Sequence, residues 1–94
     1  MDRASRLAAL LRSRMLDEQL TANLLDPQKE VVEARVAATI PTALAAFEAP
    51  DIAFVWLTSP NISLGGSIPM HMIVRSDLDA IKVRQVLDKI RQVR

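Results

Sequence analysis

The sequence predicts an all-α protein, a compact bundle of about six short helices with one loop rich in Pro, Asn and Gly. The 94-residue chain contains only two Gly and no Tyr, and half of its residues are hydrophobic. Ala, Leu, Arg, Glu and Gln are frequent, which is a composition typical of helices. In the first and last segments, apolar residues recur at the three- and four-residue spacing of an amphipathic helix. We therefore expect one cooperative, helical unit.

Residues 1–48 are expected to form an N-terminal helical region. An amphipathic first helix is predicted by the spacing of four apolar residues, which are Leu7, Leu10, Leu11 and Met15. Asp17 is expected to cap a short second helix, and Asp26 a third one that begins with Pro27 and continues to about residue 39. Pro41 is expected to end that helix or to open the next, over residues 42–47.

Residues 49–94 are expected to form a second functional region. Pro50 opens a predicted helix that runs through Trp56, and the Pro, Asn, Ser and Gly residues of positions 58–67 predict an irregular loop. Pro69 opens another short helix. Ser76 and Asp79 have the spacing of a capping box for the last helix. The buried stripe predicted for this helix comprises Ala80, Val83, Val86, Leu87 and Ile90.

The segment over residues 56–69, WLTSPNISLGGSIP, contains the most informative pattern of the chain. It resembles the signature of the Xre/MbcA/ParS toxin-binding antitoxin domain, and the resemblance covers about residues 51–90. The matching residues, which become candidate toxin contacts, are Trp56, Leu57, Pro60, Asn61, Leu64, Gly65, Gly66 and Pro69. The segment has prolines at both ends, an Asx-turn residue and a Gly pair suited to positive φ. This pattern predicts a rigid platform. The alternative is that the Trp and Leu residues are simply core and the Gly pair a turn.

The resemblance implies the antitoxin of a type II toxin–antitoxin system. Antitoxins of this family typically neutralise RES-domain toxins, which consume NAD or transfer its ADP-ribose, by covering the entrance to the toxin's active site. Residues 58–94 contain six basic and three acidic residues and would face the toxin. The candidates for contacts with an acidic rim, or for the space of a dinucleotide, are Arg75, Arg84, Arg91 and Arg94. The alternative for each is a solvated charge near a helix end.

A second hypothesis is a DNA-binding autorepressor, because family members often carry an N-terminal helix-turn-helix. Residues 17–25 and 26–38 resemble such a pair weakly, since the turn lacks Gly and the second helix carries more acidic than basic residues. The candidate DNA contacts are Gln28, Lys29 and Arg35, with Arg3, Arg6, Arg12 and Arg14 on phosphates. The alternative is a dimerisation or packing module. We expect a homodimer or a toxin–antitoxin hetero-oligomer, with the first helix as the dimer seam.

Catalysis, cofactors and metal sites are not expected. The chain has no Cys, and its single His, His71, lacks partners at metal-ligand spacing or a recognisable nucleophile motif. His71 is instead expected to be half-buried in a short helix with a hydrogen-bond partner. Charged or polar residues interrupt every apolar stretch, and no signal-peptide pattern follows the N-terminus. These features lead us to expect a cytoplasmic, non-enzymatic binding protein without membrane contact.

Overall fold

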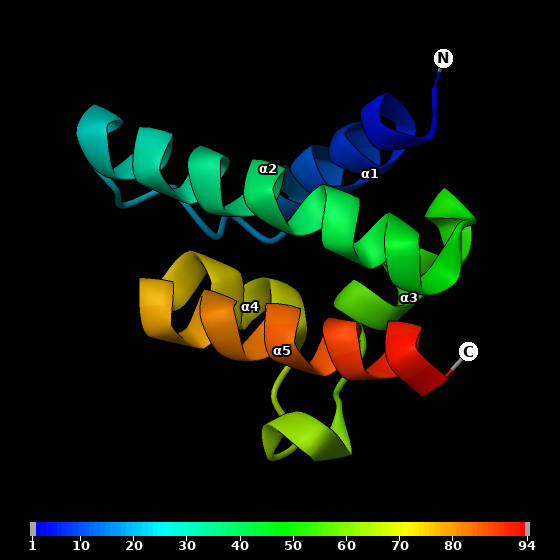
Figure 1. The fold of residues 1–94 in the computed structure, drawn as a ribbon. Helices are drawn as coiled ribbons and strands as arrows, with labels where there is room; N and C mark the ends of the chain where they lie inside the picture. Colours follow the sequence, from blue (N-terminus) through cyan, green and yellow to red (C-terminus); the bar gives the residue numbers. More distant parts are fainter. Residues whose placement is uncertain (1, 94) are drawn as a thin grey trace.

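The computed structural model describes residues 2–93, which form five α-helices and one short 3-10 helix (Figure 1). The elements are α1 (Arg3–Asp17), α2 (Asp26–Phe47), α3 (Pro50–Leu57), η1 (Ile62–Leu64), α4 (Pro69–Arg75) and α5 (Asp77–Val93). The all-α prediction is confirmed. In Figure 1, α2 extends across one side of the molecule, α4 and α5 lie beneath it, and the segment around η1 projects from the opposite side.

The predicted amphipathic first helix is present as α1, and three of the four residues of its predicted apolar stripe are buried, while Leu10 is half-buried. Asp2 caps α1 by accepting a 2.7 Å hydrogen bond from the backbone N–H of Ser5. Leu7, Leu11 and Met15, at four-residue spacing, are all buried. Leu7 and Leu11 are enclosed by this chain's own core, so these two side chains are not exposed to form the expected dimer seam.

The predicted short helix after Asp17 does not form, because Asp17 ends α1 instead of opening a new helix. The N–H of Leu20 bonds to the carbonyl of Met15, and the N–H of Gln19 bonds to that of Leu16. Together with the positive φ of Gln19 (+55°), this is the Schellman arrangement that terminates helices. Residues 18–23 therefore form turns, and the first helix of the expected helix-turn-helix pair is absent.

The two helices expected on either side of Pro41 are one continuous helix, α2, so the predicted break is wrong. Pro41 removes one backbone hydrogen bond, the one to the carbonyl of Ala37. Both residues lie on the exposed side of α2, where water can bond to the freed carbonyl. On the other side, Ile40 and Ala43 are buried and hold the helix against the core. The burial of apolar side chains on one face of α2 thus outweighs the loss of one backbone hydrogen bond on the other face.

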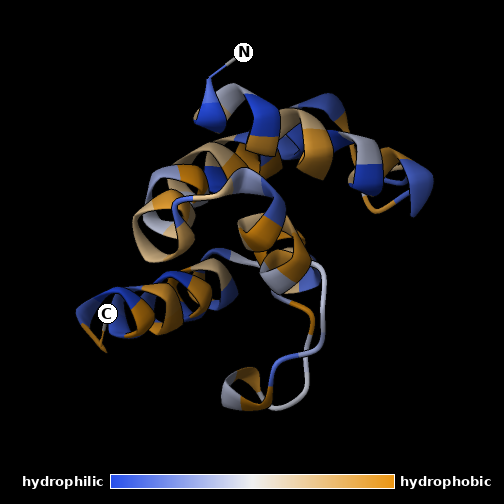
Figure 2. Cartoon of the chain, turned by 90° about the vertical axis from the view of Figure 1, so that its right-hand side faces the viewer, coloured by the Kyte–Doolittle hydropathy of each residue, from blue (hydrophilic) through white to orange (hydrophobic). Residues whose placement is uncertain are grey.

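The core is shared by both regions of the chain. Val32, Val36 and Ile40 of α2 pack in one cluster with Val83 and Leu87 of α5. In Figure 2, apolar and polar residues alternate along the helices, as is typical of amphipathic helices. No single helix among residues 2–93 is long and apolar enough to span a membrane; α2 and α3 pass such a test only as a pair, which is bent by 115°.

Candidate functional site

The loop over residues 58–67 is ordered by its own hydrogen bonds rather than irregular throughout. Asn61 and Ser67 form an isolated antiparallel bridge, with a 3.1 Å bond from the Asn61 N–H to the Ser67 carbonyl. The N–H of Gly66 returns to the carbonyl of Asn61 at 2.8 Å. The side-chain oxygen of Asn61 accepts from the N–H of Ser63 at 2.9 Å, so the predicted Asx turn is present. These bonds close a small ring that contains η1.

The Gly pair occupies two successive positions of positive φ, +67° at Gly65 and +84° at Gly66. Such angles are costly for other residue types, which explains why Gly is found at both. The closed ring projects from the helices (Figure 2). Ile62 lies within this ring and is 97% exposed. Leu64, in contrast, is half-buried and packs against the core.

Residues at both ends anchor this projecting ring. Leu57, at the end of α3, is fully buried, and Pro69 is buried at the first position of α4. Pro60 is exposed just before the ring. The aromatic side chains of Trp56 and Phe47 are in contact, with 5.8 Å between their centroids, and Trp56 is half-buried against the core. Core packing and a contribution to the site are therefore compatible for Trp56.

A mostly apolar groove of about 490 Å³ lies between this ring and α5. Trp56, Asn61 and Ser63 line one side of the groove. The other side is formed by successive turns of α5 and consists of Val86, Lys89, Ile90 and Val93. Val93 is 88% exposed although it is aliphatic. The groove thus presents apolar surface to water, as binding surfaces do.

A more polar hollow continues from the groove along α5. Its charged residues include Arg75, Asp79, Lys82 and Lys89. Arg75 donates a hydrogen bond to Asp79, and this bond holds the pKa of Asp79 below its ordinary value despite partial desolvation. The N–H of Asp79 bonds to the hydroxyl of Ser76, so one of the two bonds of the predicted capping box is present.

Of the four arginines predicted for the site, the three that the structure describes are divided between two surfaces. Arg75 borders the polar hollow, whereas Arg84 and Arg91, seven residues apart, share a face of α5 that differs from the face of Val86 and Lys89. Arg84 is half-buried and Arg91 is exposed. Arg94 lies outside the described residues.

The residues predicted to contact DNA are largely engaged within the chain. Arg35 is only 17% exposed at its side chain, and it pairs with Asp77. Gln28 accepts a hydrogen bond from the N–H of Leu25 and thereby caps α2, while Lys29 is exposed. The four arginines of α1 also have partners, which are the carbonyl of Glu48 for Arg3, Asp51 for Arg6, Glu33 for Arg12 and Glu18 for Arg14.

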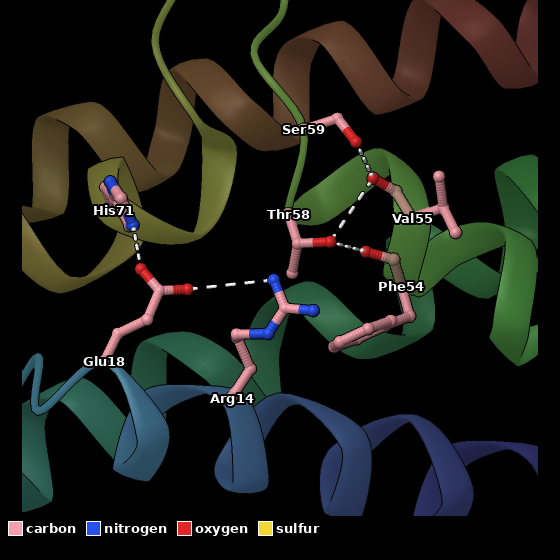
Figure 3. Close-up of polar contacts among 7 residues, drawn as sticks. All are labelled: Arg14, Glu18, Phe54, Val55, Thr58, Ser59 and His71. Atoms are coloured by element: carbon pink, nitrogen blue, oxygen red, sulfur yellow. Dashed lines mark hydrogen bonds and ion pairs between the residues drawn. The ribbon is translucent and has the colours of Figure 1, made fainter.

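His71 has the half-buried position and the hydrogen-bond partner expected for it. Its Nε2 lies 2.8 Å from a carboxylate oxygen of Glu18, which also faces Arg14 (Figure 3). The guanidinium of Arg14 lies 5.1 Å from the centre of the Phe54 ring. These contacts connect α1 to Phe54 of α3 and to His71 of α4. Residues 2–93 hold no group of three metal-ligating side chains.

Sequence reasoning missed five members of the groove, which are Ser63, Val86, Lys89, Ile90 and Val93. Val86 and Ile90 are predicted in the buried stripe of the last helix, whereas in the structure both are only half-buried and line the groove. The signal for Val93 was available, because it continues the spacing of Val86 and Ile90 by three residues. The signal for Ser63 and Lys89 was not, since only the packing of the loop beside α5 brings them together.

One family model matches the chain. It describes the C-terminal toxin-binding domain of the antitoxin Xre/MbcA/ParS, and it covers residues 42–92, more than half of the 94 residues. The matched segment contains the whole loop, the groove residues of α5 except Val93, and the last part of α2. No curated protein and no solved structure matches the chain significantly.

Proposed function

Because the chain belongs to the family of antitoxins with the Xre/MbcA/ParS toxin-binding domain, we propose that it neutralises a RES-type toxin that consumes NAD or transfers its ADP-ribose. In this proposal the C-terminal region binds the toxin in the cytoplasm and covers its active site. The chain then acts as the protein antitoxin of a type II system and performs no catalysis itself.

The observation that carries this proposal is the rigid ring over residues 61–67 beside an apolar groove, both inside the matched segment. Binding favours surfaces that are already ordered, because less conformational entropy is lost when the complex forms. The bonds of Asn61 and the two Gly residues provide this order, and Ile62 and Val93 provide exposed apolar surface. Trp56 and Leu64 support the loop from below.

The test is co-expression of the chain with the product of the adjacent open reading frame, followed by purification of the complex and an NAD-consumption assay. Stable co-purification with suppressed loss of NAD is expected. Ile62→Asp places a charge on the exposed ring and should weaken the complex. Leu16→Asp makes the same kind of change on an exposed residue of α1 and serves as the matched control. Absence of any complex would refute the proposal.

The arginines form a separate part of the proposal. Arg75, Arg84, Arg91 and Arg94 would contact the acidic rim of the toxin or the space of its dinucleotide, as the excess of basic residues after residue 57 indicates. Because Arg84 and Arg91 lie on one face of α5, they would act together. Deletion of residues 91–94 with full retention of neutralisation would refute the roles of Arg91 and Arg94.

The alternative function, autorepression by binding operator DNA, has less support from the geometry. Arg35 is occupied by Asp77 and Gln28 by a helix cap, and the arginines of α1 face carboxylates or a carbonyl. An arginine that binds phosphate would have to leave these partners, and the nearby carboxylates would repel the phosphates. An electrophoretic shift of the operon's promoter by the chain alone, abolished by Lys29→Glu, would support repression. If the chain shifts the promoter and forms no complex with the toxin, autorepression would replace the antitoxin function as the proposal.

A further inference from the structure

The groove beside the ring has the length of two helical turns. Val86, Ile90 and Val93 follow one another at spacings of four and three residues along α5. Seven residues of α-helix rise by about 10 Å, which is roughly two turns. Trp56 and Ser63 border the opposite side. A second helix that lies along α5 would therefore meet side chains over two of its own turns.

The charges around the groove are mainly positive. Lys89 lines the groove and has no ion-pair partner among residues 2–93. Lys82 and Arg75 border the adjoining hollow, and Asp79 is the acidic side chain there. Asp79 is already engaged by Arg75 and, at 3.9 Å, by Lys82. A partner that covers this surface gains most if it brings carboxylates to Lys82 and Lys89.

We propose that the groove binds an amphipathic helix of the partner toxin, with apolar side chains between Trp56 and Val93 and Asp or Glu side chains beside Lys82 and Lys89. This inference rests on the proposed function and specifies the chemistry of the partner segment. Helix-in-groove recognition uses anchors spaced three, four and seven residues apart, which fits the two-turn length. An added strand has no template here, because the only β-bridge among residues 2–93 is the one that closes the loop.

Two pairs of variants test the apolar and the charged contacts in the complex with the purified product of the adjacent open reading frame. Val93→Asp should weaken binding by roughly 30-fold, because it replaces an apolar contact at the end of the groove with a charge. Lys89→Gln should weaken it by about fivefold at low salt and reduce the salt dependence. Their controls on exposed positions of α1 are Leu16→Asp and Ser13→Glu, which should each change affinity by less than about twofold.

Cross-linking identifies the occupant of the groove directly. Because the chain has no Cys, a single Ser63→Cys variant can carry a thiol-directed benzophenone inside the groove. Mass spectrometry should find the cross-link on a toxin helix with an apolar stripe flanked by acidic residues. Ser13→Cys, on α1, should not label that helix.

The outcomes separate this inference from the proposed function. A stable complex whose Ser63 cross-link falls on a toxin strand, on a basic segment or on a second copy of this chain overturns the inference and leaves the antitoxin role intact. A stable complex that tolerates both Val93→Asp and Lys89→Gln overturns it as well. If no complex forms at all, both the proposed function and the inference fail.

Discussion

Replacement of Arg35 by Met tests whether this residue holds the molecule together rather than binding a ligand. One guanidinium nitrogen of Arg35 donates to the carbonyls of Ile73 and Val74 at 3.2 and 3.0 Å, and another nitrogen pairs with Asp77. These carbonyls are at the end of α4, where the last carbonyls lack partners within the helix. Arg35 therefore fastens α2 to the junction between α4 and α5. Met retains the apolar stem of the side chain and removes only the donors.

The cost of Arg35→Met follows from the exposure of each contact. The shared bond to the two carbonyls is partly buried and charge-assisted, so its loss should cost about 1.5–3 kcal/mol. Asp77 is 75% exposed at its side chain, so the ion pair adds at most about 1 kcal/mol. A total of about 1.5–4 kcal/mol corresponds to a decrease in Tm of roughly 6–30 °C for a domain of this size.

Urea denaturation of Arg35→Met and of Asp77→Asn, followed by circular dichroism, measures both contributions. The structure predicts that the Arg35 variant loses at least twice as much free energy of unfolding as the Asp77 variant. Equal losses would show that the ion pair, and not the carbonyl contact, dominates. A loss below about 1 kcal/mol for Arg35→Met would refute the fastening role altogether.

Three further predictions concern the loop, the core and the acid range. Gly65→Ala and Gly66→Ala should each lower the free energy of unfolding, measured by urea denaturation, by about 1 kcal/mol, because Ala is strained at a positive φ. An added Cβ meets no atom within 4 Å at either position, so a larger loss would contradict the assignment of the cost to backbone strain alone. Leu57→Ala should cost about 2–5 kcal/mol in the same assay, because Leu57 is fully buried, and a loss below 1 kcal/mol would contradict its role as the anchor of the loop. The hydrogen bond from Arg75 holds the pKa of Asp79 below its ordinary value. The ionised Asp79 therefore stabilises the fold at any pH above the ordinary pKa of Asp, and this stabilisation is lost as the pH falls through the lowered pKa. Unfolding measured across this range should therefore show that the advantage of the wild type over Asp79→Asn shrinks with acid, and an advantage that grows would contradict the assignment.

The helices that the sequence predicted well are those with a long apolar stripe. In α5, Ala80, Val83 and Leu87 are buried as their spacing indicates. The errors lie where one residue type serves two purposes. Asp17 is a favoured residue for the start of a helix, yet it lies at the end of α1, and Gln19 adopts a positive φ without being Gly.

Pro41 and Arg35 illustrate what local patterns cannot supply. A proline ends a helix unless its lost hydrogen bond faces solvent and the opposite face is buried, and that orientation depends on tertiary packing. Arg35 looked like a free cation because its partners lie about forty residues away in the chain. Tertiary packing decides both cases.

For the candidate site, the loop was predictable and the groove was not. The turn chemistry of Asn61, Gly65 and Gly66 is local, and the structure contains the expected Asx turn and positive φ angles. The groove needs the loop beside α5, and the residues that meet there are separated by about thirty positions. Short-range patterns do not contain such distances.

The position of α2 limits how this antitoxin can be divided. The matched segment begins at residue 42, inside α2, whereas Val32 and Val36 in the earlier turns of the same helix belong to the core shared with α5. A fragment cut at the start of the matched segment would lose these side chains and leave part of the apolar stripe of α5 facing water. Anyone who transplants the toxin-binding domain into a fusion protein should therefore graft it from the beginning of α2, at Asp26.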